Sequence, residues 1–115
     1  MSVKISIRQV GDVTVIDAVG RITLGEGAST FRDTVRELAG KGQKKILLNL
    51  NEVSYIDSSG IGEMVSGFTS ITNQGGQLKL VGLTKRVKDL LQITKLYTVF
   101  EVFDDEASAV RSFSA

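Results

Sequence analysis

The 115-residue chain contains no cysteine and no histidine. Without cysteine it forms no disulfide and no thiolate metal site. Without histidine it lacks the commonest general base, the usual transition-metal ligand and every Ser-His nucleophile pair. Hydrolysis by paired carboxylates and magnesium chemistry with oxygen ligands stay open. These absences narrow the chemistry that is open to the chain. We expect no catalytic residue, no metal site and no cofactor of its own.

Net charge and long apolar runs are also scarce. The formal net charge is +1 at pH 7, so no bulk field would recruit nucleic acid or an anionic membrane. The sequence shows no uninterrupted apolar run of the kind found in signal peptides or membrane spans. We expect a cytoplasmic protein without nucleic-acid or membrane partners. The length and the 42% hydrophobic content suit a single domain over residues 1–115.

Hydrophobic periodicity alternates along the chain between the patterns of strands and helices. The predicted strands are residues 3–10, 13–19, 45–50, 77–81 and 99–103. The predicted helices cover residues 27–39, 57–72, 85–95 and a closing segment after residue 105. The continuous apolar run 45–50 is typical of a central strand covered on both faces. The order β-β-α-β-α-β-α-β-α predicts an α/β fold, a mixed sheet of about five strands with about four helices packed on it.

The turn Asp57-Ser58-Ser59-Gly60 joins a predicted strand to a predicted helix. Aspartate and serine lead the N-cap preference, so these residues favour a helix start. Gly62 and Gly67 lie within the helix, where each costs about 0.5 to 1 kcal/mol relative to alanine. Such a cost indicates a packing or functional reason. Helix capping and close packing within the fold remain alternatives to a binding role.

Small residues form a stripe along this helix. Ser59, Gly62 and Ser66 lie three and four residues apart, beside Glu63 and Gly67, and so share one side of the helix. The apolar side is different, and we expect its first residue, Ile61, to be buried. A low surface of small side chains would let the backbone of another protein approach closely.

The segment 55–62, Tyr-Ile-Asp-Ser-Ser-Gly-Ile-Gly, resembles the signature of bacterial anti-sigma-factor antagonists (anti-anti-sigma factors) of the STAS domain family. The resemblance covers nearly the whole chain. It is supported by Gly20-Arg21-Ile22, by the strand 46–50, by Gly75-Gly76, and by the segment 87–91 with Leu96.

The resemblance implies a phosphorylation switch. Ser58, with Ser59 as second choice, would be phosphorylated by a partner that is both an anti-sigma factor and a serine kinase of the histidine-kinase-like ATPase type. The unphosphorylated antagonist binds this partner and frees the sigma factor; phosphorylation blocks binding, and a serine phosphatase restores it. ATP and magnesium would belong to the partner. The expected partner-binding residues are Thr23, Asp57, Ser58, Ser59, Gly60, Gly62, Glu63 and Ser66. We expect the chain itself to be a monomer or a weak dimer.

A phosphate adds about 1.5 to 2 negative charges, which a helix N-terminus tolerates and a docked partner does not.

At Thr23 the family often carries an acidic residue; threonine can still cap a main-chain amide. We interpret the basic cluster Lys85, Arg86 and Lys88 as a solvated face.

Three other functions are kept as alternatives. The chain could be a STAS scaffold or sensor of a larger signalling complex, or a soluble STAS subunit of a transport system. It could also bind a nucleotide at the helix start after residue 57. The glycines there do not complete a G-x-G-x-x-G motif, which disfavours the nucleotide.

Overall fold

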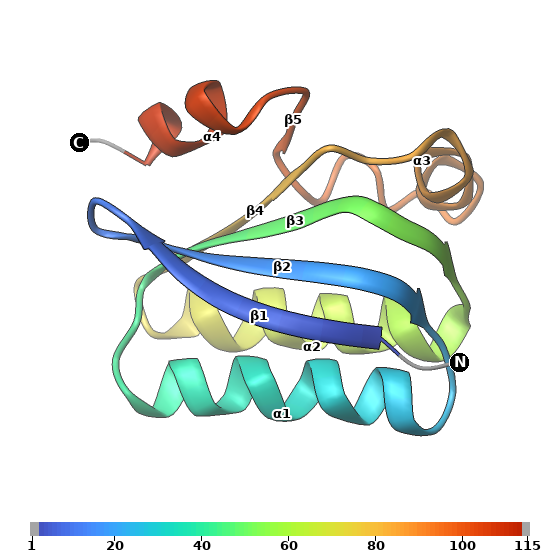
Figure 1. Cartoon of the computed structure of the whole chain (residues 1–115), viewed down its shortest axis with the longest axis horizontal. Coiled ribbons are helices and arrows are strands. Elements are labelled where there is room, and N and C mark those ends of the chain that lie inside the picture. Colours follow the sequence, from blue (N-terminus) through green and yellow to red (C-terminus); the bar gives the residue numbers. More distant parts are fainter. Residues whose placement is uncertain (1–2, 114–115) are drawn as a thin grey trace.

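The computed structural model describes residues 3–113. Five strands form one sheet, in the order β1-β2-β3-β4-β5 (Figure 1). The strands are β1 (Val3–Val10), β2 (Val13–Ile22), β3 (Lys45–Ile56), β4 (Gln77–Val81) and β5 (Val102–Phe103). β1 and β2 form an antiparallel hairpin, and the other pairs are parallel. The predicted α/β class and the predicted order of elements are confirmed.

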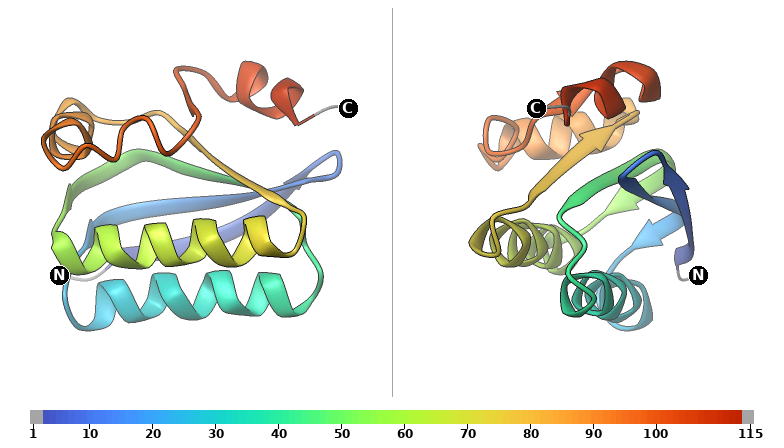
Figure 2. Two further views of the ribbon diagram at one scale, coloured as in Figure 1. Left: turned by 180° about the vertical axis from the view of Figure 1, so that it is seen from behind. Right: turned by 90° about the vertical axis from the view of Figure 1, so that its left-hand side faces the viewer.

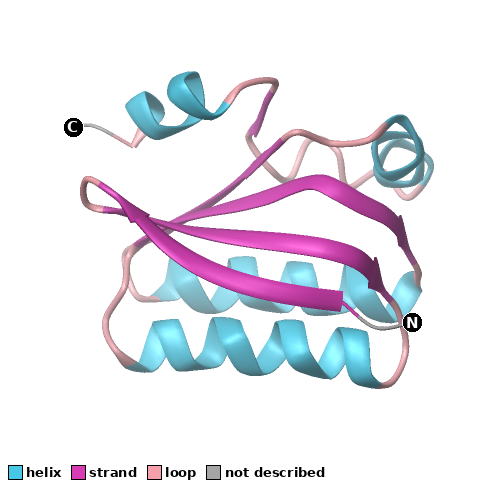
Figure 3. Ribbon diagram, viewed as in Figure 1, coloured by secondary structure: helices cyan, strands magenta, loops and turns pink. Residues whose placement is uncertain are grey.

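Helices lie on both sides of the sheet (Figure 3). They are α1 (Glu26–Gly40), α2 (Ser58–Asn73), α3 (Lys85–Ile93) and α4 (Glu106–Ser112). α1 and α2 run side by side beneath the sheet in Figure 1, whereas α3 and α4 lie above it. Within residues 3–113, no helix is both long enough and apolar enough to cross a membrane.

β3 is buried on both faces, as its apolar run predicts. Leu48 belongs to the main core between the sheet and the α1–α2 pair, together with Phe31 and Met64. Its neighbour Leu47 points the other way, into a smaller core under α4 that contains Phe113. Successive side chains on a strand face opposite sides, so a central strand needs apolar residues at every position.

Three strands differ in length from the prediction. β2 continues past residue 19 to Ile22, because residues 20–22 remain paired with β3. β3 continues past residue 50 to Ile56 although Asn51 and Glu52 are polar and exposed. These residues lie beyond the pairing with β4, which ends at Asn49, so their side chains reach solvent. β5 has only two residues where the segment 99–103 is predicted, because the chain before it is a turn that places Phe100 in the main core.

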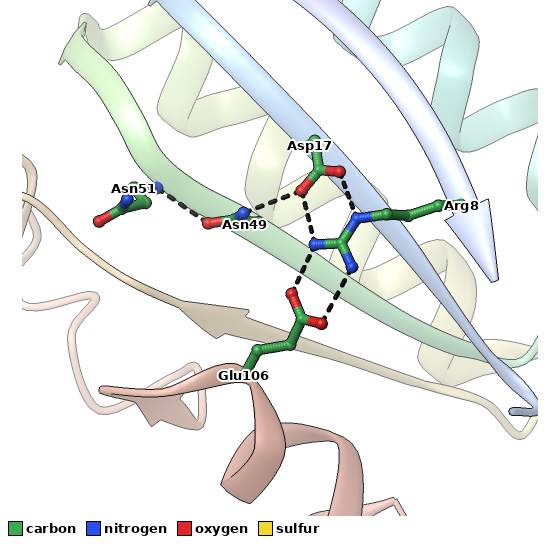
Figure 4. Close-up of polar contacts among 5 residues, drawn as sticks. All are labelled: Arg8, Asp17, Asn49, Asn51 and Glu106. Atoms are coloured by element: carbon green, nitrogen blue, oxygen red, sulfur yellow. Dashed lines mark hydrogen bonds and ion pairs between the residues drawn. The ribbon is translucent and has the colours of Figure 1, made fainter. Parts of the chain in front are cut away.

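A polar network ties α4 to the hairpin (Figure 4). The Arg8 guanidinium donates hydrogen bonds to Asp17 on β2 and to Glu106 at the start of α4. The same bonds hold the pKa of both carboxyl groups below their usual range. Asn49 of β3 also donates to Asp17, at 2.8 Å. The closing helix is therefore joined to strands from the opposite end of the chain.

The other end of α4 is held by a buried lysine. Lys79 in β4 is 3% exposed, and its Nζ donates to the main-chain oxygen and to the hydroxyl of Ser112, both at 3.0 Å. A cation at the carboxyl end of a helix is favourable because the last carbonyl groups lack partners. α4 is thus fixed to the sheet at both of its ends.

Candidate functional site: the turn at the start of α2

The predicted site lies where β3 passes into α2. Ile22 and Ile56, the last residues of β2 and β3, are paired in the sheet, and α1 and α2 begin shortly after them. Figure 1 shows both helix starts, together with α3, at one end of the molecule (right in the view). The right-hand view of Figure 2 shows α1 and α2 lying parallel. Three connections therefore lie at this end: the loop between β2 and α1, the turn between β3 and α2, and the segment that leads into α3.

Asp57 fixes this turn through both of its carboxylate oxygens. Oδ1 accepts a hydrogen bond from the N–H of Gly60 at 2.9 Å, so Asp57 is the N-cap of α2. Oδ2 accepts from the N–H of Leu24 at 2.8 Å, in the loop between β2 and α1. Hydrogen bonds from Leu24 and then Gly60 lower the pKa of this carboxyl group. The predicted structural role of Asp57 as a helix cap is confirmed, and it also joins two loops.

Gly60 allows α2 to start directly against the sheet. It is buried, and a Cβ added there would lie 2.1 Å from the main-chain oxygen of Ile22 and 2.7 Å from Cγ2 of Ile56. Real side chains do not reach such distances, so only glycine fits without a shift of the backbone. Close packing within the fold is sufficient to explain this glycine.

Ser58 is the first residue of α2 and is exposed, whereas Ser59 is half-buried. Asp57 before it is held by two hydrogen bonds and Gly60 after it by close packing, so the main chain that carries the Ser58 hydroxyl is anchored on both sides. A phosphate at the first helical position would lie near the positive end of the helix dipole. The geometry therefore accommodates modification at Ser58 more easily than at Ser59.

The small residues along α2 have two different roles. Gly67 is buried against Val35 of α1, where an added Cβ would lie 3.2 Å from Cγ1, so it serves the packing of the two helices. Gly62 is exposed, and apart from its chain neighbours and the nearby main chain of α2, no atom of residues 3–113 lies within 4 Å of a Cβ added there. Ser66 is also exposed. Packing within the described part of the fold therefore explains the glycine at position 67 but not the one at position 62.

Two further α2 residues face inward or towards α1. Ile61 is 7% exposed, which confirms that it is a core residue. Glu63 is half-buried, and its Oε2 lies 3.5 Å from Nη1 of Arg32 on α1. The exposed surface of α2 near Ser58 is therefore made chiefly by Gly62 and Ser66.

The loop from β2 to α1 contains Thr23, which was predicted, and Leu24, which the sequence did not point to. Thr23 is half-buried, and its main-chain oxygen accepts from the N–H of Ala28 at 2.8 Å. The N-cap of α1 is Gly25, without a side-chain cap, so a threonine hydroxyl cap does not hold this turn. The side chain of Leu24 is 78% exposed although its N–H is bound to Asp57. The one sequence feature that could have pointed to Leu24 is its position between Thr23 and Gly25, where an apolar side chain interrupts a turn.

Comparison with known proteins decides the family. The STAS domain profile matches residues 4–109. The chain belongs to the STAS domain family. The anti-sigma-B factor antagonist of Bacillus subtilis is 30% identical over 102 residues, which cover 89% of this chain and 92% of the relative. The resemblance inferred from the signature is thus confirmed.

Solved structures of STAS proteins agree with this fold. A crystal structure of a Thermotoga maritima protein, provisionally named an anti-sigma factor antagonist, has a TM-score of 0.88 at 29% identity, over 95% of this chain and 93% of that one. The Bacillus cell fate determinant SpoIIAA in its phosphorylated form has a TM-score of 0.76 at 18% identity, over 96% of this chain and all of that one (100%). At 18% identity this second likeness shows the shared fold.

The carboxylate of Asp57 gives the turn a pH-dependent stability. In D57N one amide oxygen can still accept from Gly60, but an NH2 group would face the N–H of Leu24. We expect D57N to lower the free energy of unfolding at pH 7 by about 1 kcal/mol. Because the folded-state pKa is lowered, this contribution is full above the unfolded pKa of about 3.9 and is lost as the pH falls through the folded value.

Urea unfolding of the wild type and D57N at neutral and acidic pH measures this difference. The matched control is D104N, which removes an exposed carboxylate from the loop before α4 and should change little. A difference between wild type and D57N that stays constant down to the lowest pH would show that the charge of Asp57 is unimportant.

Proposed function

We propose that this chain is an anti-sigma-factor antagonist whose binding is switched off by phosphorylation at Ser58. In its unmodified form it binds an anti-sigma factor that is also a serine kinase, and a sigma factor is released. The kinase transfers the γ-phosphoryl group of its own magnesium-bound ATP to the Ser58 hydroxyl oxygen, which loses its proton, and ADP is left on the kinase. A serine phosphatase removes the group and restores binding.

One observation supports the proposal above the others: Ser58 is exposed on a turn that is anchored on both sides by hydrogen bonds and close packing. Asp57 bonds to Leu24 and Gly60, and Gly60 packs against the end of β2. A phosphate there can be added without disturbing the fold, since the helix N-terminus favours negative charge by about 0.3 to 1 kcal/mol. That SpoIIAA has been solved in a phosphorylated form agrees with a STAS fold that tolerates the modification.

The remainder of the docking surface would be formed by residues around that turn. Ser58 and Ser59 lie at its centre, with Asp57 and Gly60 shaping the main chain beneath them. Gly62, Glu63 and Ser66 continue the surface along α2, and Thr23 continues it on the neighbouring loop. A partner seated here must bury the Ser58 hydroxyl, so a dianion at that position would be desolvated or repelled.

The test uses the candidate kinases of the source organism. The purified chain is mixed with each histidine-kinase-like ATPase, and complexes are detected by size-exclusion chromatography and calorimetry. ATP and magnesium are then added, and the modified residue is mapped by mass spectrometry. We expect one stoichiometric complex that dissociates as Ser58 gains one phosphate. A large homomeric shell would instead support the scaffold function, and modification confined to Ser59 would move the acceptor by one residue.

A further inference from the structure

Two arginines contact the same aromatic ring next to the proposed site. The guanidinium carbon of Arg21 lies 5.5 Å from the ring centroid of Tyr55, and that of Arg86 lies 5.2 Å from it. Arg21 is paired with Tyr55 across β2 and β3, whereas Arg86 comes from the first turn of α3. The sequence separates these residues widely, and the fold brings them together.

The charges of both arginines are not neutralised within residues 3–113. The neighbouring Lys85, by contrast, pairs with Asp89 on α3 at 2.8 Å. The ion pairs of the described residues include neither Arg21 nor Arg86, and both side chains belong to exposed residues. A guanidinium placed over a ring keeps its N–H groups free for a further acceptor. Two donor groups thus lie at one ring, available to an anionic acceptor.

An apolar hollow adjoins Arg86 and Tyr55. It has a volume of about 270 Å³ and is lined by Tyr55, Arg86, Leu90 and Ile93, with Asp89 at its side. Ile93 is 77% exposed, which for a large apolar side chain is unusual in this molecule and is matched only by Leu24 among residues 3–113. The surface therefore combines free guanidinium groups with space for an apolar side chain.

We propose that Arg21, Tyr55 and Arg86, with Leu90 and Ile93, bind an acidic segment of the partner protein that carries an apolar side chain. The carboxylates take the guanidinium edges, and the apolar side chain enters the hollow beside Ile93. This inference rests on the proposed function and extends its docking surface from α2 to α3. The continuity is direct, because Tyr55 is the next-to-last residue of β3 and Ser58 is the first of α2, and β3 passes into α2 at one end of the molecule (Figure 1).

A peptide fits this surface better than nucleic acid does. Unstacked bases bind on free aromatic faces, but the ring of Tyr55 is already contacted by both guanidinium groups. The formal net charge of the whole chain is only +1, so little long-range attraction for a polyanion exists. Charge complementarity restricted to one small patch suits a short acidic segment.

The test compares two double variants that lose the same charge. R21Q/R86Q removes both guanidinium groups at the ring, whereas R36Q/K44Q removes two exposed cations from α1 and the loop after it. A short synthetic peptide of glutamate and leucine is titrated into each labelled protein and followed by NMR. We expect shifts at Arg21, Tyr55, Arg86 and Ile93 in the wild type and in R36Q/K44Q, and none there in R21Q/R86Q.

The affinity for the kinase, measured by calorimetry at two salt concentrations, gives the second readout. We expect R21Q/R86Q to bind about tenfold more weakly with a smaller salt dependence, and R36Q/K44Q to bind like the wild type. Equal affinities of the two double variants, or peptide shifts that centre elsewhere, would overturn the inference. So would an oligonucleotide that competes with the peptide at this surface. Failure to find any kinase partner would contradict the proposed function alone, because the peptide titration does not depend on it.

Discussion

Replacing Ser58 by aspartate is expected to weaken binding to the anti-sigma kinase by about 100-fold and to leave the domain folded. The weakening follows from placing a charge in a position that the partner must desolvate, which costs several kcal/mol. The fold survives because Ser58 is exposed at the first position of α2, where an added carboxylate is favoured by the helix dipole. Calorimetry measures the binding, and thermal unfolding measures the stability.

Two control variants separate charge from position. S58A keeps a small neutral side chain, so it should bind like the wild type and stay bound when ATP is added. S70D adds the same charge further along α2, at an exposed residue outside the proposed docking surface, and should bind like the wild type. Loss of binding in S70D would mean that the net charge of the helix matters more than the turn at its start.

Replacing Gly60 by alanine is expected to destabilise the domain by about 3 kcal/mol, which would lower the melting temperature by about 10 °C. The added methyl group would overlap the main-chain oxygen of Ile22 at the end of β2. That oxygen also accepts from the N–H of Asp57, so it cannot move away without loss of a hydrogen bond. Strain at this point affects the junction of β2, β3 and α2 at once.

The matched variant G62A should have the opposite effect on stability. Apart from its chain neighbours and the nearby main chain of α2, a Cβ there meets no atom of residues 3–113 within 4 Å, and alanine is preferred to glycine in a helix by about 1 kcal/mol. We expect G62A to unfold at a higher temperature than the wild type and to bind the kinase about tenfold more weakly, because the methyl group would stand on the docking surface. A stabilised G62A with unchanged affinity would exclude Gly62 from that surface.

The sequence predicts the order of the elements because local signals agree with the tertiary fold. Asp57, Thr84 and Asp105 each accept a main-chain hydrogen bond at the start of a helix, as their residue types favour. The continuous apolar run in β3 correctly indicates burial on both faces. The extension of β3 to Ile56 is not visible in the sequence. Its pairing with β4 ends at Asn49, so the strand residues beyond that point can be polar and do not show a strand pattern.

Contacts between distant segments lie outside what periodicity can predict. Arg8 meets Glu106 although 98 residues separate them. Gly62 and Gly67 look alike in the sequence, and only the position of Val35 on α1 shows that one packs within the fold and the other does not. For the same reason Arg86 can be interpreted from sequence as a solvated cation, whereas the structure places it against Tyr55 beside Arg21.

The affinity of the isolated phosphorylated chain for its anti-sigma kinase, compared with that of the unmodified chain, tests the switch itself. Both forms are purified, shown to have the same far-ultraviolet circular dichroism, and titrated into the kinase by calorimetry. The proposed switch predicts identical spectra and an affinity at least about 100-fold lower for the form that carries phosphate on Ser58. Equal affinities would contradict it, and so would a phosphorylated form that has lost its fold.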